Sequence, residues 1–145
     1  MDLYRAQSYF VHSAERIFDL VADIERYPEF LPGWVSVRLR QRQGDLLSVD
    51  QVLGWGPIQL SFRSIARLDR PERLEIQCQS GSVRNTRIEW IFEADSRGGC
   101  QATLAVHTPP EGLGLRGRLV QKVLGALAPT VLTHFQRRAA TLYSV

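Results

Sequence analysis

The C-terminal part of the chain carries one long apolar stripe at helical spacing, and this stripe limits the possible folds more than any other feature. From about Leu113 onward the stripe consists of Leu119, Val123, Leu127, Val131, Phe135, Ala139 and Leu142. Roughly 30 residues of α-helix at about 1.5 Å each give about 45 Å. This is longer than any predicted strand of the chain, so we expect the helix to lie across a whole sheet.

A proline interrupts this predicted helix. Pro129 removes the backbone hydrogen bond to the carbonyl of Gly125. A kink there would bend the helix over a curved sheet, whereas a break would give two helices. The sequence leaves both alternatives open.

The segment 35–106 alternates apolar and polar residues with a period of two, which is typical of half-buried antiparallel strands. Turn sequences rich in glycine separate the alternating runs, and residues 2–11 form one further run at the start of the chain. The alternation changes phase between Phe62 and Ile65, which predicts a β-bulge near Ser64. We therefore expect about seven strands, mostly joined by hairpins.

Two short helices are expected after the first strand. Ser13 is a suitable N-cap, and apolar residues recur at helical spacing from Ile17 to Ile24. Pro28 and Pro32 then break the chain into an aromatic-rich connection. The predicted fold class is α+β, with a curved antiparallel sheet wrapped around the C-terminal helix in a single domain, 1–145.

The composition fits one domain that needs no disulfide or metal to hold its core. Cys78 and Cys100 lack the spacing of a zinc or redox motif and are expected to be buried thiols. The N-terminus has no apolar signal sequence, and no apolar run reaches the roughly 18 residues of a membrane span. We expect a cytoplasmic protein, with peripheral membrane attachment as an alternative.

The charge is unevenly distributed. The formal net charge is +3, yet five basic residues and no acidic residue follow Glu111, while residues 1–111 carry a net charge of −2. Such asymmetry fits either a solvated helix face or an anionic partner, namely a membrane surface or ribosomal RNA. The candidate contacts are Arg116, Arg118, Arg137 and Arg138.

The order of elements resembles the helix-grip fold of the START and polyketide-cyclase superfamily. Residues 21–32, Val-Ala-Asp-Ile-Glu-Arg-Tyr-Pro-Glu-Phe-Leu-Pro, resemble the start of coenzyme Q-binding proteins and of the related bacterial ribosome-association toxin. Residues 135–143, Phe-Gln-Arg-Arg-Ala-Ala-Thr-Leu-Tyr, are similar to the final helix of that branch. The sheet strands match only in pattern, and Gly33-Trp34 departs from the residues common in that branch.

The resemblance implies a cavity between sheet and helix for a hydrophobic molecule such as a quinone, a lipid or a polyketide. Ligand sites of this kind are mostly apolar with a few placed polar groups. Aromatic residues on the proline-broken segment, on the strands and on the helix could line the cavity or its mouth, or they could simply fill the core. The candidates are Tyr27, Phe30, Trp34, Trp55, Phe62, Trp90, Phe92, Val123, Leu127, Val131 and Phe135.

No motif assigns a catalytic residue, a metal site or a cofactor. Residues 112–117 match G-x-G-x-x-G, but the parallel βαβ context and the later acidic residue of a dinucleotide site are missing. His12, His107 and His134 are scattered in the sequence. Asp23, Glu25 and Glu29 cluster around the proline-broken segment, where they would either do acid–base work or have the more ordinary role of pairing with Arg26 or facing water. Asp50 is a mid-strand carboxylate that either faces solvent or has a role in the interior.

Three functions remain open. The leading hypothesis is a non-catalytic binder or carrier of a small hydrophobic ligand. The second is a polyketide cyclase or aromatase, which needs an arginine, histidine or carboxylate directed into the cavity. The third is a ribosome-associating, toxin-like protein that docks through the basic C-terminal helix. No DNA partner is expected, and the oligomeric state is not predicted.

Overall fold

The computed structural model describes residues 2–108 and 114–143. Pro109, Pro110 and the first two residues of the G-x-G-x-x-G match lie outside this described part. The N-terminal elements are β1 (Asp2–Phe10), α1 (Ala14–Ala22), the 3-10 turn η1 (Ile24–Arg26) and α2 (Tyr27–Phe30). Then follow β2 (Trp34–Gln43), β3 (Leu46–Trp55), β4 (Ile58–Asp69), β5 (Arg73–Cys78), the 3-10 turn η2 (Gly81–Val83), β6 (Arg87–Ala94), β7 (Cys100–His107) and α3 (Gly114–Leu142).

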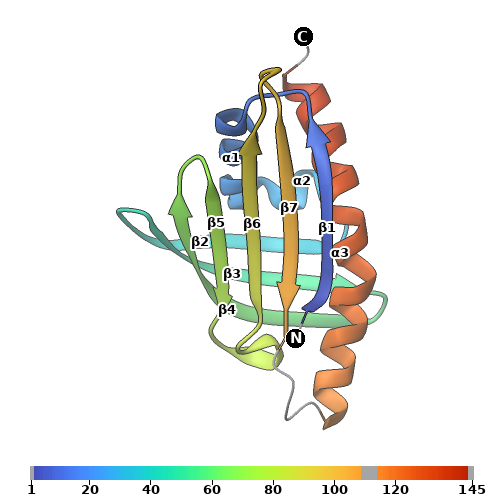
Figure 1. The fold of residues 1–145 in the computed structure, drawn as a ribbon. Coiled ribbons are helices and arrows are strands. Elements are labelled where there is room, and N and C mark those ends of the chain that lie inside the picture. The colour runs from blue at the N-terminus through green and yellow to red at the C-terminus, as the bar shows by residue number, and fades with distance from the viewer. Residues whose placement is uncertain (1, 109–113, 144–145) are drawn as a thin grey trace.

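The seven strands in the described part of the chain form one antiparallel sheet in the order β1-β7-β6-β5-β4-β3-β2. The sheet bends strongly, so that β2, β3 and β4 run across the direction of β1, β6 and β7 (Figure 1). Helix α3 runs beside β1 along the whole structure, and α1 and α2 cover one end (Figure 1). The predicted α+β helix-grip fold, its seven strands and its two short helices are confirmed.

Strand β4 contradicts the predicted bulge near Ser64. The pairing of β4 with β3 continues without a shift from Leu46 opposite Arg67 to Trp55 opposite Ile58. Ser64 is fully buried because it occupies an inward position of an unbroken alternation, where an apolar residue was expected. The irregular pairing lies in β2 instead, between Trp34 and Ser36 and again further along the strand.

Helix α3 is continuous, so the alternative of two helices is wrong. Pro129 and Gly125 both lie on the exposed side of the helix. The carbonyl that loses its backbone partner therefore faces solvent, where water can replace the missing hydrogen bond. At the other end of the chain, the predicted N-cap is confirmed, since the backbone N–H of Arg16 donates to Ser13 Oγ at 3.2 Å.

Two groups of buried side chains fill the concave face of the sheet. The first, here called the aromatic cluster, packs α1, α2 and the C-terminal half of α3 against the sheet and contains Phe10, Phe18, Tyr27, Trp90, Phe92 and Phe135. The second, here called the aliphatic cluster, involves the N-terminal half of α3 and contains Leu53, Leu60, Phe62, Cys78, Val83, Val106, Val120, Val123, Leu124, Leu127 and Ala128. The two clusters meet in the middle of the concave face.

Candidate ligand-binding site

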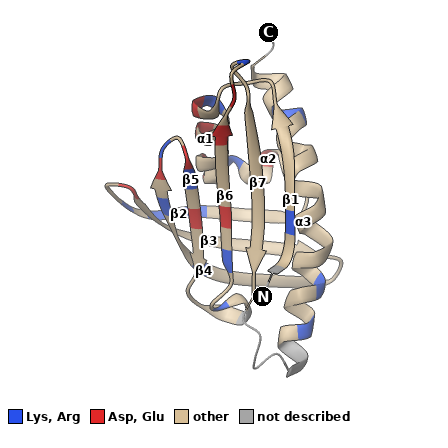
Figure 2. Ribbon diagram, in the orientation of Figure 1, with Lys and Arg blue, Asp and Glu red and all other residues tan. Residues whose placement is uncertain are grey.

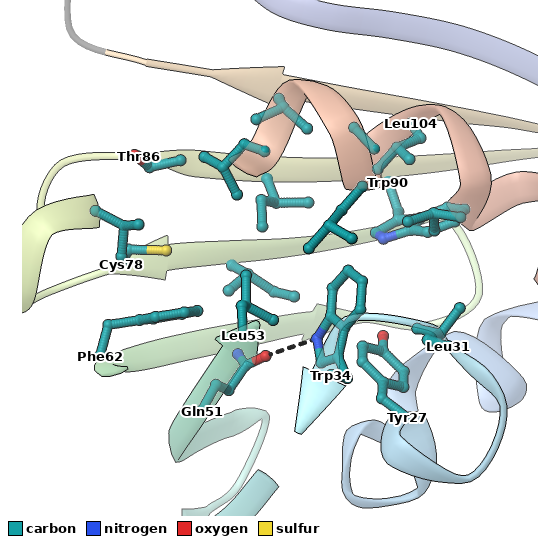
Figure 3. Close-up of a pocket in the computed structure, with 18 of the residues that line it drawn as sticks. Tyr27, Leu31, Trp34, Gln51, Leu53, Phe62, Cys78, Thr86, Trp90 and Leu104 are labelled. Atoms are coloured by element: carbon teal, nitrogen blue, oxygen red, sulfur yellow. Dashed lines mark hydrogen bonds between the residues drawn. The ribbon is translucent and has the colours of Figure 1, made fainter. Parts of the chain in front are cut away.

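A cavity lies at the boundary between the aromatic and the aliphatic cluster, enclosed by the sheet, α2 and α3 (Figure 3). Measured as positions for the centre of a water molecule, its volume is about 50 Å³. One water needs about 10–15 Å³ in this measure, so the cavity has room for roughly three to five waters. A larger ligand would require side chains or α3 to move.

The structure brings seven of the eleven predicted site residues together around this cavity. They come from α2, from the three strands β2, β4 and β6, and from α3, and they are Tyr27, Trp34, Phe62, Trp90, Leu127, Val131 and Phe135. The strand residues among them occupy inward positions, which is why segments far apart in the sequence meet here.

Of the other four predicted residues, two belong to the packing behind the aromatic wall of the cavity. Phe92 stacks on Trp90 with a centroid distance of 5.9 Å and touches Phe18 of α1 at 5.7 Å. Phe30 packs edge-on against Phe135 at 5.1 Å.

The remaining two lie toward the N-terminal half of α3. Val123 is fully buried within the aliphatic cluster. Trp55 is 37 % exposed near the turn between β3 and β4, where the Lys122 ammonium lies 5.4 Å from the centre of its ring.

Tyr27 is the centre of the aromatic wall. Its ring makes edge contacts with Trp34 at 6.0 Å and with Phe135 at 5.6 Å. The Tyr27 hydroxyl donates a hydrogen bond to the carbonyl oxygen of Val21. Burial, assisted by the charge of Asp23, raises the pKa of Tyr27 far above its usual value, so this hydroxyl stays neutral.

Gln51 is a cavity residue that the sequence analysis missed. Its amide oxygen accepts a hydrogen bond from the Trp34 indole at 3.2 Å, as the dashed line in Figure 3 shows. Its amide nitrogen donates to Ser64 Oγ at 2.9 Å. The missed signal was a polar residue at an inward position of β3, between the apolar Val49 and Leu53.

Asp50, the polar residue that the sequence analysis singled out in β3, points to the opposite face of the sheet. There its carboxylate pairs with Arg40 and with Arg63, each at 3.0 Å. Burial alone would raise the pKa of Asp50, but the hydrogen bonds and charges of Arg63 and Arg40 outweigh burial and lower it. Asp50 therefore stays charged on the outer face, where it cannot reach a ligand in the cavity.

The cavity also contains a thiol. Cys78 lines it, and burial raises the pKa of this thiol to about 12. The second predicted buried thiol, Cys100, lies in the aromatic cluster, and burial raises its pKa to about 11. At neutral pH both are protonated and therefore poor nucleophiles.

No charged or histidine side chain is found among the described residues that line the cavity. His107 lies on the outer face of the sheet with Nε2 3.5 Å from Glu89. The carboxylates near α2 have the expected structural role, since Asp23 and Glu29 both pair with Arg26, at 3.1 and 3.2 Å. The described lining residues therefore include no group that gains or loses a proton near neutral pH.

A second hollow lies on the other side of the aromatic cluster, between α1, η1 and strands β2 to β4. It is wider, about 330 Å³ in the same measure, and its rim carries charged residues. Asp19 and Arg70 close part of this rim through two hydrogen bonds at 2.8 and 3.0 Å. Its charged rim makes it a poorer match than the first cavity for an apolar ligand.

The four arginines predicted as contacts for an anionic partner do not form one patch. Arg118 and Arg137 are exposed, but they are about 28 Å apart along the helix axis. Arg138 pairs with Glu29 at 3.0 Å and lies over the ring of Phe30 at 5.0 Å, so it helps to hold α3 in place. The side chain of Arg116 is outside the described part of the chain.

Two further properties concern metals and membranes. Within residues 2–108 and 114–143, no three His, Cys, Asp or Glu side chains gather in a way that could hold a metal ion. Within the same residues, no helix combines the length and the apolar character needed to cross a membrane.

The family model for polyketide cyclase / dehydrase and lipid transport matches residues 11–136. The chain belongs to this family. The predicted membership in the START and polyketide-cyclase superfamily is thereby confirmed. The chain is similar to the ribosome association toxin RatA of Pseudomonas aeruginosa. The two sequences are 28 % identical over 136 residues, which cover 91 % of each chain.

Solved structures support the same fold for this polyketide cyclase / dehydrase family member. A START superfamily protein from Mycobacterium smegmatis superposes with a TM-score of 0.74 at 17 % identity, covering 96 % of this chain and 97 % of the other. The Zhui aromatase/cyclase from Streptomyces sp. R1128 superposes with a TM-score of 0.77 at 14 % identity, covering 94 % and 92 %. At these identities the likeness concerns the fold alone.

Proposed function

We propose that this protein binds a small hydrophobic molecule in the cavity between the sheet and α3, and that it does so without transforming it. The observation that carries the proposal is the lining itself, which is almost entirely carbon and contains a few neutral polar groups. Apolar walls with few polar groups are the usual composition of ligand sites. The family description, which includes lipid transport, is consistent with this function.

The cyclase alternative is less well supported. Acid–base catalysis needs a group that can gain or lose a proton within hydrogen-bond reach of the substrate. Among the described lining residues, the ionisable groups are Tyr27 and Cys78, and burial keeps both neutral. We therefore propose binding rather than turnover.

Filling the cavity is the direct test. Ala128 lines the cavity and is buried, so Ala128→Leu places three additional carbon atoms in or beside it. We expect indane, a bicyclic hydrocarbon, to shift backbone amide signals of cavity residues in an NMR titration of the wild-type protein, and Ala128→Leu to abolish these shifts.

The matched control is Ala140→Leu, which makes the same chemical change at an exposed position of α3. This variant should bind indane like the wild type. Indane binding that survives Ala128→Leu, or no binding to the wild-type protein at all, would contradict the proposal.

Docking to an anionic macromolecule such as ribosomal RNA is a second candidate function. The exposed basic residues Arg118, Lys122 and Arg137 lie along α3, and the helix from Gly114 to Leu142 contains no acidic residue (Figure 2). The name of the RatA relatives agrees with a ribosomal partner. Because phosphate contacts release counterions, such binding should weaken steeply with salt.

The test is co-sedimentation with ribosomes at increasing salt. Replacing Arg118, Lys122 and Arg137 together with glutamine should remove salt-sensitive binding. Arg138 is left in place because it pairs with Glu29. The control variant carries Arg67→Gln and Arg84→Gln, two exposed positions outside α3, and should bind like the wild type. Ribosome binding by the α3 variant that equals the binding by this control variant would rule this function out.

A further inference from the structure

Three side chains and one carbonyl form a chain of hydrogen bonds along the sheet wall of the cavity. The Trp34 indole N–H donates to Gln51 Oε1 at 3.2 Å, and Gln51 Nε2 donates to Ser64 Oγ at 2.9 Å. Ser64 Oγ in turn donates to the carbonyl oxygen of Val49 at 3.3 Å. The chain joins β2, β3 and β4 beneath the cavity.

The direction of this chain is fixed at both of its ends. An indole N–H can only donate, and a backbone carbonyl can only accept. The oxygen of Gln51 must therefore face Trp34, and its nitrogen must face Ser64. The amide of Gln51 cannot turn over without breaking both of its hydrogen bonds.

This fixed orientation leaves one donor without a partner. The amide nitrogen of Gln51 carries two hydrogens, and Ser64 accepts one of them. The other has no acceptor among residues 2–108 and 114–143, although Gln51 lines the cavity and is only 4 % exposed. A buried donor without an acceptor is unfavourable, and a ligand oxygen would satisfy it.

We propose that Gln51 recognises a hydrogen-bond acceptor on the ligand, so that the ligand is a small apolar molecule that carries an uncharged acceptor oxygen, such as a carbonyl oxygen. This inference rests on the proposed binding function of the cavity. A carboxylate or phosphate group fits less well, because the described lining residues offer it no cation. A pure hydrocarbon would leave the Gln51 donor unsatisfied.

The test compares two ligands of the same shape. Indan-1-one differs from indane by one carbonyl oxygen, and both affinities are measured by NMR titration of the full chain. We expect the wild-type protein to bind indan-1-one about three- to tenfold more tightly than indane, as for one neutral hydrogen bond. Gln51→Leu should remove this preference while still binding indane.

Thr86→Val is the matched control. Thr86 also lines the cavity and is 2 % exposed, but it lies away from Gln51 at the far side of the cavity in Figure 3. This variant removes a hydroxyl with little change of shape and should keep the preference for indan-1-one. A preference lost in Thr86→Val and kept in Gln51→Leu would overturn the assignment.

The outcomes separate this inference from the proposed function. Equal wild-type affinity for the two compounds overturns the role of Gln51 and leaves the cavity proposal standing. No binding of either compound removes both. The wild-type comparison decides the ligand class even if Gln51→Leu does not fold.

Discussion

The two halves of α3 are held against the sheet by different interactions. The C-terminal half packs its Phe135 among the rings of Tyr27, Phe30 and Trp90 and is also held by polar contacts. Gln136 donates to Ser8 Oγ at 2.7 Å and to the carbonyl oxygen of Tyr9 at 2.6 Å. The N-terminal half is held by the aliphatic cluster.

The polar contacts of the N-terminal half are correspondingly few. In the described residues from 117 to 128, the polar side-chain contact to another element is the one between Lys122 and Trp55. Apolar packing is non-directional, whereas edge contacts between rings and hydrogen bonds hold a specific geometry. From this comparison we expect the N-terminal half of α3 to be the wall that moves when the proposed ligand enters the cavity.

Phe135→Ala should have the largest effect, because it removes the ring that joins Tyr27, Phe30 and Trp90. Phe135 is fully buried, and a change of this kind lowers the free energy of unfolding by about 3–5 kcal/mol. Urea denaturation measures the loss. Leu142→Ala, at a half-exposed position of the same helix, should change the free energy by less than about 0.5 kcal/mol.

Leu127→Ala should cost less stability and gain binding. Leu127 belongs to the aliphatic cluster and already borders empty space, so we expect a loss of about 2–3 kcal/mol in the free energy of unfolding. The wider cavity should bind indane more tightly than the wild type does. Leu119→Ala, which truncates an exposed leucine of the same half of α3, is the control. Unchanged indane affinity in Leu127→Ala would contradict a yielding wall at this position.

The two thiols report on the two clusters separately. Cys78 lies in the aliphatic cluster and Cys100 in the aromatic cluster, and both react only when the structure opens locally. We expect Cys78 to react with Ellman's reagent about tenfold faster than Cys100, which equals about 1.4 kcal/mol of opening free energy. The rates are measured in the single-cysteine variants Cys100→Ala and Cys78→Ala. Equal rates would show that the clusters open together.

Asp50→Asn should have the smallest effect, because it changes neither cluster. Arg63 and Arg40 lower the pKa of Asp50 in the folded state, so its stabilising contribution is complete above about pH 4 and is lost as the pH falls through the folded pKa. At pH 7 the variant should be less stable by at most about 1 kcal/mol.

The difference between Asp50→Asn and the wild type should shrink below about pH 4, as measured by urea denaturation at pH 7 and pH 3. Asp45→Asn, at an exposed residue with no ion pair among the described residues, serves as the control and should show no such trend. A difference that grows in acid would contradict the assigned direction of the Asp50 pKa.

The sequence predicted the fold and part of the cavity because both depend on periodicity. Alternation identified the inward face of each strand, and this was sufficient to find Phe62 and Trp90. The alternation failed for Ser64 and Gln51, which are polar residues at inward positions. In the sequence, such a residue resembles either a change of phase in the alternation or a residue on the outward face. The pairing of these two residues across β3 and β4 depends on register, which the sequence alone does not specify.

Trp55 illustrates a second limit of the sequence analysis. Trp55 has the inward parity of β3, yet it is the last residue of the strand, next to the turn, and it stays partly exposed. Whether a residue of correct parity reaches the cavity depends on the length and curvature of the sheet. Neither quantity can be read from the alternation of residues.

The irregular pairing of β2 has a consequence for the behaviour of the protein in concentrated solution. β2 forms one edge of the sheet, and an open edge can recruit strands from other molecules. Its two register shifts interrupt the row of free backbone groups, and Arg38, Arg40 and Arg42 add exposed positive charge along it. We therefore expect the strand that supplies Trp34 to the cavity also to protect the chain against edge-to-edge aggregation.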